Sequence, residues 1–422
     1  MASLQLWQQS EVIRKGAFPF WGVKKFNVLS DFIKRGEVTN IGERDFRIPF
    51  KKTFGGRVGK YDPQFGDMGR GSQMTGDVMI QSYFNLRLNF EMDMLAIKAT
   101  QHKSIALQDP FKDAVANGFF EFKLYRDKFY HSDGTAVLAT ATAHSAASGV
   151  SIYTLDSEFG AQRLRRGQYV SVYNNALTTQ LSANTLYIAY INTQTKVVAL
   201  SGVVPGAAAT DKITFEGVSG AQPTGLRGLY YWINSATSGI TAGVDRALEP
   251  QIVSKSVDAG GGAMLPEQVM ALYHRILNDR GEVANGLLGV SSPAQQASVY
   301  KNVMSIQNYD ISGTSVQATD RLPALKGKKS FMWGDQPHYV DIHQSKTRND
   351  YIIPDQWGIA RLDEEKFFET PGTSQRFFPL YGGSGAPAAG VWFSITVDED
   401  LYNVDPGAQG VVSNLAIDPL YV

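Results

Sequence analysis

The segment from Arg44 to Met94 constrains this chain most, because it describes an arm that cannot pack against itself. Its first limb, Phe46–Lys51, alternates apolar and polar residues, and its second limb, Phe84–Met94, does so more strictly. Period-two alternation places the apolar side chains on one face of a strand. Seven glycines mixed with charged residues separate the limbs, and such a stretch buries too little apolar area to order alone. We therefore expect a long β-hairpin over residues 44–94 that reaches onto a neighbouring copy of the chain.

The charged side chains between the two limbs are the candidate contacts between subunits. They are Arg57, Lys60, Asp62, Asp67 and Arg70. A single exposed charge pair contributes at most ~1 kcal/mol. Symmetric repetition in many copies multiplies such contacts, so modest interfaces can build a durable assembly.

Composition excludes several classes of protein. A chain of 422 residues can bury a large core, and two or three domains are expected. Forty basic residues balance forty acidic ones, so no global field attracts nucleic acid or a membrane surface. The absence of cysteine excludes disulfides, thiolate catalysis and cysteine zinc sites. There is no secretory signal pattern and no apolar run near the ~20 residues of a membrane span, so we expect a soluble protein.

The charges are unevenly distributed along the chain. Residues 1–60 hold twelve Lys or Arg against five Asp or Glu, whereas no Lys or Arg follows Arg376. Two interpretations stay open: two ordinary solvated surfaces, or a basic N-terminal arm that meets acidic surface on an adjacent subunit. The run Asp398–Asp400 breaks the calcium-loop pattern at Tyr402, so a solvated face is expected there. The acids after Arg376 are Asp398, Glu399, Asp400, Asp405 and Asp418.

Three prolines predict the starts of helices, because proline suits the first helical position. Asp109 is a good N-cap before Pro110, and apolar residues then recur every three to four positions for about twenty residues. A second helix begins at Pro266 and ends before Gly281. A third begins at Pro293 and ends near Ile306.

Residues 137–222 differ in composition, with Ala, Ser, Thr, Gly and β-branched residues dominating. Short strands separated by turn signals predict a small β-barrel or sandwich inserted between helical parts. The predicted strands are Val150–Leu155, Tyr169–Tyr173, Leu186–Asn192, Lys196–Leu200 and Lys212–Phe215. Further strands are predicted at Gly286–Val290, Ser330–Trp333, Tyr339–Ile342, Asp350–Ile353 and Val391–Val397.

No motif points to catalysis, to a cofactor or to a metal. None of the six histidines has zincin spacing, so structural or surface roles are expected, with His338 and His343 on opposite faces of one strand. The glycine-rich segment Phe54–Tyr61 lacks the first glycine and the Ser or Thr of a phosphate-binding loop. No nucleic-acid-binding motif is present, although the basic arm could touch phosphate non-specifically. We expect no enzyme.

The order of these parts, together with several short motifs, resembles the major capsid proteins of tailed phages. These proteins have the Hong Kong 97-like fold, and the resemblance is to the group with an inserted small β-domain. No long helical segment precedes the arm, which the resemblance links to a separate scaffolding protein. The motifs are His131–Ala139 after the long helix, Leu164–Val170 at the start of the insert, Thr224–Leu229 at its end, and Val257–Gly262 before the Pro266 helix.

The resemblance implies an α+β fold with six parts and a shell function. Copies would form hexamers and pentamers of an icosahedral capsid around double-stranded DNA, assembled in the host cytoplasm with a portal and a cement protein as further partners. No membrane is involved. The parts are an N-terminal arm (1–43), an extended hairpin loop (44–94), a peripheral domain with a spine helix (95–136), an inserted β-domain (137–222), a mainly axial α/β domain (223–328) and return strands of both domains (329–422).

Two other functions stay open. An encapsulin-like compartment shell would share the fold but would need a cargo enzyme, and the insert argues against it. A β-rich tail or decoration protein of a virion could use residues 137–222 to bind surface glycans. An enzyme comes last, because no site fits.

Overall fold

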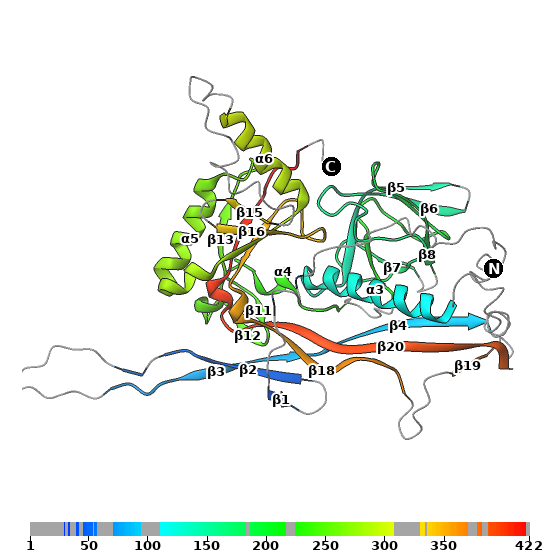
Figure 1. The fold of residues 1–422 in the computed structure, drawn as a ribbon, viewed down its shortest axis with the longest axis horizontal. Helices are drawn as coiled ribbons and strands as arrows, with labels where there is room; N and C mark the ends of the chain where they lie inside the picture. The colour runs from blue at the N-terminus through cyan, green and yellow to red at the C-terminus, as the bar shows by residue number, and fades with distance from the viewer. Residues whose placement is uncertain are drawn as a thin grey trace, which may run out of the picture. The chain divides into compact units, whose positions relative to one another are not determined.

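The computed structural model divides the chain into two compact units, and each is described by itself (Figure 1). Of the described residues, the first unit takes those in Phe84–Lys128 and Arg361–Glu399. The second takes those in Leu29–Tyr83, Phe129–Ala360 and Asp400–Val422. The structure describes residues 29, 33, 39–41, 45–53, 55–56, 71–93, 110–147, 149–182, 186–216, 224–307, 330–333, 336–369, 378–381 and 387–418.

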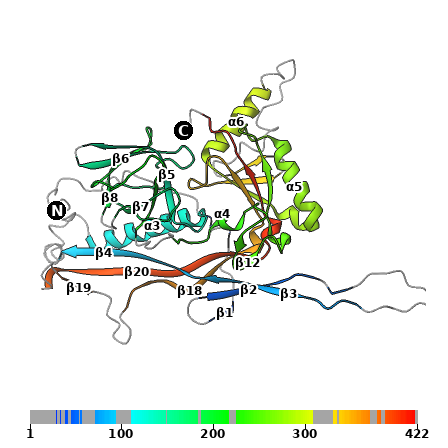
Figure 2. The same cartoon turned by 180° about the vertical axis from the view of Figure 1, so that it is seen from behind.

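The first unit is built around a long antiparallel strand pair. Strand β4 (Phe84–Asp93) pairs with β20 (Pro387–Asn403) along its whole length, from Phe84 opposite Glu399 to Asp93 opposite Gly390. Both views show the two strands side by side (Figures 1 and 2). The strands β18 (Trp357–Phe367) and β19 (Phe378–Tyr381) flank β20 in the same sheet.

Helix α3 (Pro110–Tyr130) covers the apolar face of this strand pair and confirms the long helix predicted after Asp109. Phe90 of β4 and Phe393 of β20 stack at 4.8 Å between ring centroids. Gly118 lies on the helix directly over Phe90, and a Cβ there would overlap the Phe90 ring. Glycine has a low helix propensity, so the sequence alone predicts that Gly118 weakens the helix. Its role is to let the helix approach the sheet.

The hairpin differs from the one that the sequence predicts. Strand β2 (Asp45–Lys51) pairs with β3 (Gly76–Ser82), from Asp45 opposite Ser82 to Lys51 opposite Gly76. Strand β1 (Thr39–Ile41) adds to the outer side of β2. The strictly alternating limb is β4, which lies in the other unit, so the expectation of one hairpin over 44–94 is wrong in its return limb. Alternation shows that a strand has one buried face, but it does not say which strand is its partner.

Six strands between Val137 and Phe215 form a closed barrel. Four of the five predicted strands have the predicted bounds. The other, predicted at Lys196–Leu200, starts one residue later, at Val197. The strand that the sequence did not reveal is β5 (Val137–Ala147), because its run of Ala, Ser and His has little β-propensity. The strand order is β10-β5-β6-β9-β8-β7, with β6 (Val150–Leu155), β7 (Tyr169–Tyr173), β8 (Leu186–Asn192), β9 (Val197–Leu200) and β10 (Lys212–Phe215).

A six-stranded mixed sheet lies next to helices α5 (Pro266–Arg280) and α6 (Pro293–Gln307). These two helices confirm the second and third helices predicted from the sequence. Gly281 ends α5 with a positive φ of 64°, as its sequence position indicates. The order is β13-β21-β17-β14-β16-β15, with β13 (Lys255–Asp258), β14 (Leu288–Ser291), β15 (Ser330–Trp333), β16 (Gln336–Val340), β17 (Asn349–Ile352) and β21 (Gly410–Ser413).

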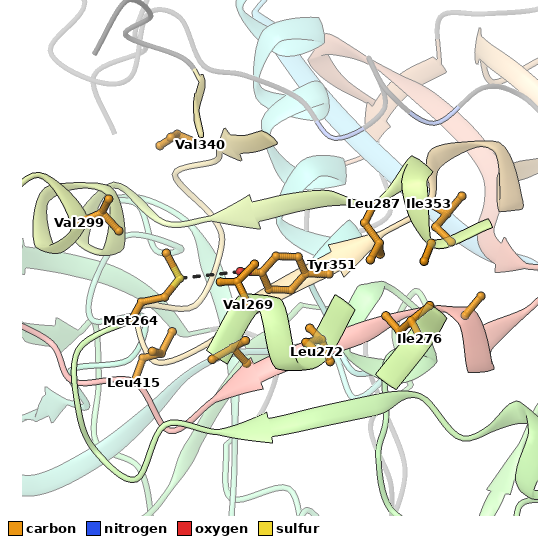
Figure 3. Packing of buried hydrophobic residues seen from close by; sticks show 13 residues of the cluster. Met264, Val269, Leu272, Ile276, Leu287, Val299, Val340, Tyr351, Ile353 and Leu415 are labelled. Atoms are coloured by element: carbon orange, nitrogen blue, oxygen red, sulfur yellow. Dashed lines mark hydrogen bonds between the residues drawn. The ribbon is translucent and has the colours of Figure 1, made fainter. Parts of the chain in front are cut away.

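The core of this part joins one face of α5 to the sheet (Figure 3). Val269, Leu272 and Ile276 recur at helical spacing and are at most 1% exposed. Tyr351 lies among them and directs its hydroxyl toward the Met264 sulfur, 3.9 Å away. In the part of the chain that the structure describes, no helix combines the length and apolarity needed to cross a bilayer.

Candidate assembly surfaces

The root of the β2–β3 hairpin is anchored in the second unit by its apolar face. Phe46 and Met79 are fully buried, and Ile48 is 3% exposed. The Phe46 ring lies 5.1 Å from the Tyr83 ring and 6.0 Å from the Tyr402 ring, measured between centroids. The alternation read from the sequence therefore sets the orientation of β2, with its polar residues facing outward.

A buried carboxylate, Asp400, holds the end of β3. The Gln81 side chain donates a hydrogen bond of 2.6 Å to Asp400 Oδ2. The backbone amides of Arg227 and Leu401 donate to Oδ1, at 3.0 and 2.9 Å. Burial raises the pKa of Asp400 to about 7, although these hydrogen bonds favour the charged form. Asp400 therefore joins the hairpin root to the segment before α4 (Leu229–Trp232).

The two limbs stay paired beyond the ends of the strands. The Thr75 amide donates to Thr53 Oγ1 at 3.1 Å, and the two threonine hydroxyls lie 2.9 Å apart. Gly55 follows with a positive φ of 73°, and a Cβ there would overlap the backbone of Met74. This position therefore requires glycine, for both conformation and space.

The predicted contact residues follow this paired segment along the chain. Arg57, Lys60, Asp62, Asp67 and Arg70 all lie outside the described residues. Their role in contacts between subunits stays a prediction.

A groove lies beside the hairpin root, within the second unit. Its volume is about 590 Å³. Pro49, Phe50 and Met79 of the hairpin line part of it, and Ile252 and Pro406 line another part. Lys52 is in the lining and bonds to Asp77 at 2.8 Å and to Glu249 at 2.6 Å. The groove is therefore largely apolar, and the Lys52 charge in its lining is already paired within the chain.

The acidic residues near the C-terminus do not form the free acidic surface considered above. Glu399 and Asp400 are 1% exposed, so the expectation of a solvated face is wrong for both. Each of the five acids has a bonding partner in the same chain. The partners and shortest distances are Asn85 to Asp398 (2.6 Å), Arg126 to Glu399 (2.6 Å), Gln81 to Asp400 (2.6 Å), Arg280 to Asp405 (2.8 Å) and Lys301 to Asp418 (2.7 Å).

Glu399 is the most strongly compensated of these acids. Arg126 of α3 binds it with two hydrogen bonds, Nε to Oε1 at 2.6 Å and Nη2 to Oε2 at 2.7 Å. Arg361 of β18 adds a third at 2.8 Å. A sequence signal for this burial exists, because Glu399 continues the period-two series of buried residues Phe393 and Val397 in β20.

The histidines predicted on one strand lie differently. Strand β16 ends at Val340, so His338 is on it and His343 is not, and both are buried. His338 Nδ1 lies 2.8 Å from the Ser291 hydroxyl. Burial lowers the pKa of His338 to about 3, so it is neutral at pH 7 and belongs to the core. The expectation of opposite faces of one strand is wrong, because the chain turns after Val340.

Comparison with known proteins gives a fold. No protein-family model matches the chain, and no curated protein matches it. Among solved structures, the cyanophage A-1(L) capsid asymmetric unit aligns with a TM-score of 0.51 at 10% identity, covering 95% of this chain and 96% of that one. The capsid of an empty GTA particle (0.45, 10% identity, 95% and 94% covered) and that of cyanophage P-SCSP1u (0.43, 8%, 96% and 94%) align less well. The chain therefore has the fold of a phage capsid subunit.

Proposed function

We propose that this chain is the structural major capsid protein of a tailed phage, and that it assembles into the icosahedral shell around double-stranded DNA. The observation that carries the proposal is the alignment to the cyanophage A-1(L) capsid subunit over nearly the full length of both chains. Its role is structural, without catalysis or a cofactor. Its site of action is the virion capsid, assembled in the host cytoplasm.

The finer assignment follows the Hong Kong 97-like plan. Helix α3 is the spine helix, and the β4–β20 sheet belongs to the peripheral domain. The sheet beside α5 and α6 is most of the axial domain, and the closed barrel is the inserted domain. The β2–β3 hairpin is the extended loop, which lies over an adjacent subunit.

The hairpin supports this assignment through the contrast between its root and its outer part. The root buries Phe46 and Met79 and is bonded to Asp400 through Gln81. Farther out, the residues from Gly71 to Asp77 are all exposed. An arm held firmly at one end, whose described outer residues 71–77 are exposed, suits contact with a neighbouring copy. Each such contact is weak, and symmetry repeats it in every copy.

The partners follow from the same proposal. Copies of the chain form hexamers and pentamers, with a separate scaffolding protein, a portal and a cement protein as further components. Contact of the basic N-terminal residues with packaged DNA would be non-specific and sensitive to salt.

Negative-stain electron microscopy of the purified full-length chain tests the proposal. We expect closed particles of uniform diameter, with light scattering giving a mass of many copies. Assembly should be sought over a range of salt, pH and crowding agent. A well-behaved monomer under all of these conditions would contradict a shell function.

A further inference from the structure

Four adjacent strands of the barrel contain no charged residue. These strands are β6, β9, β8 and β7, with sequences VSIYTL, VVAL, LYIAYIN and YVSVY. They are neighbours in that order; the outward residues of β6, β9 and β8 are half-buried or exposed, and on β7 Tyr169 alone is exposed. Charged residues make up 19% of the chain, and a solvent-facing surface without them is unusual for a soluble domain.

Three tyrosines project from this surface, and we call them the tyrosine platform. Tyr169, Tyr187 and Tyr190 are 44%, 41% and 53% exposed. Tyr169 and Tyr187 are opposite each other in the ladder between β7 and β8, and their rings meet edge to face at 5.8 Å between centroids.

A β-bulge exposes the third tyrosine. Strict alternation along β8 would place Tyr190 inside the barrel if Tyr187 points outward. The register shifts between Ile188 and Tyr190, so that Ile188 is fully buried while both tyrosines face solvent. Bulges re-aim side chains and are frequent beside functional sites. The exposure of Tyr190 is therefore a consequence of the backbone and not of a disordered side chain.

We propose that the tyrosine platform binds a neutral saccharide. A closed barrel has no free strand edge, so a partner cannot bind by adding a strand. The absence of charge on the four strands disfavours phosphate, nucleic acid and acidic ligands. Tyrosine offers a flat apolar ring together with a hydroxyl, and a sugar ring offers C–H faces together with hydroxyls.

Polar groups for hydroxyl recognition lie beside the rings. The Asn192 amide donates to the Tyr190 hydroxyl at 3.4 Å. The Ser201 hydroxyl accepts from the backbone amide of Tyr187 at 3.0 Å. Tyrosine, serine and asparagine are also the residues that recognition loops use for large contact area at a low cost in conformational entropy.

The Tyr169 and Tyr187 rings are inclined to each other by 64°, so the platform offers separate ring faces and binds one sugar unit weakly. If the shell proposed above forms, many copies display the platform at once, and repeated weak binding becomes strong attachment to a polymeric glycan. The multivalent part rests on the proposed function, whereas binding to a single chain does not.

Titration of the full-length chain with uncharged oligosaccharides tests the platform. Maltohexaose, cellohexaose, mannohexaose and N-acetylchitohexaose are the probes, followed by saturation-transfer NMR and calorimetry. We expect at least one to bind, and both Tyr187→Ala and Tyr190→Ala to weaken it by about tenfold or more, which corresponds to ~1.4 kcal/mol. Val203→Ala is the matched control, because Val203 lies in the loop between β9 and β10 and has the same 53% exposure as Tyr190.

Three outcomes would overturn the inference. One is the absence of binding to all four probes, and another is unchanged binding by the Tyr187→Ala, Tyr190→Ala double variant. The third is a double variant that loses self-association while no probe binds, which would make this face a protein interface. Sugar binding by a chain that never assembles would count against the shell function and leave the platform intact.

Discussion

At the scale of single residues, the burial of two adjacent carboxylates in β20 is compensated by different groups. Glu399 forms ion pairs with Arg126 and Arg361, which supply full countercharge. Asp400 accepts hydrogen bonds from amide groups of Gln81, Arg227 and Leu401, and its one arginine, Arg227, lies at the longer distance of 3.5 Å. Burial outweighs these contacts, and it raises the pKa of Asp400 to about 7.

The raised pKa of Asp400 predicts a pH dependence of stability. Between the ordinary aspartate pKa and about 7, the folded chain holds a proton that the unfolded chain has lost. The free energy of unfolding therefore decreases as pH rises through this range, and this contribution is constant above it. Asp400→Asn should remove it, so the melting temperature of the variant should fall less between pH 4.5 and 7.5 than that of the parent. Circular dichroism melts of unassembled subunits measure this.

The control for this experiment is Asp398→Asn, which removes a carboxylate from the same strand at a less buried position. The comparison shows whether the effect belongs to position 400 or follows from removing any carboxylate of this strand. Parallel curves for the parent and Asp400→Asn would show that Asp400 titrates normally.

The pairing of Glu399 predicts a large effect of removing one arginine. Arg126→Ala removes one of the two arginines that bind the buried Glu399 carboxylate, and breaking a buried pair costs about 3–5 kcal/mol. Lys301→Ala breaks the pair with Asp418, in which the lysine is 69% exposed, and should cost less than ~1 kcal/mol. Urea unfolding of the two variants measures the difference. Equal losses would contradict the assigned role of Glu399.

At the scale of elements, the contact between α3 and β4 depends on one missing side chain. In an exposed helix, replacing glycine by alanine stabilises by roughly 1 kcal/mol. At Gly118 the added methyl would overlap the Phe90 ring. Packing therefore outweighs helix propensity at this position.

Gly118→Ala should destabilise the chain by about 1–3 kcal/mol, the range for an overfilled core. Adding Phe90→Leu should recover part of the loss, because the shorter side chain leaves room for the methyl group. Urea unfolding of the single and double variants gives the coupling free energy. A gain in stability from Gly118→Ala alone would show that the helix does not lie on Phe90.

At the scale of the whole molecule, neither unit is a single stretch of chain. The chain passes between units after Tyr83, Lys128, Ala360 and Glu399. One cut in the chain would therefore not separate the two units. The β2–β3 hairpin differs, because both of its limbs belong to the second unit.

Removing the hairpin tip should separate folding from assembly. Replacing residues 57–70 by a short glycine linker leaves β2, β3 and the Thr53–Thr75 pairing in place. We expect the variant to keep the parent's circular dichroism spectrum and lose closed particles in negative stain. Replacing the same residues with a scrambled copy of equal composition is the control for loop length. Normal particles from the deletion would remove the role assigned to the tip.

The sequence by itself determined the elements whose signals are local. The prolines and glycines that bound α3 and α5, and the alternation in β2 and β4, follow from backbone geometry, so they can be read in short windows. Most barrel strands were found in the same way. The tyrosines of the platform were within predicted strands, yet the exposure of Tyr190 depends on a bulge that no local pattern revealed.

Only the tertiary structure decided which elements became partners. It paired β2 with β3 and β4 with β20, and it placed Phe90 under Gly118. It also buried Glu399 and Asp400, whose partners are far away in the sequence. The physical reason is that a local pattern indicates which residues will be buried. Which residues bury them depends on contacts between distant parts of the chain.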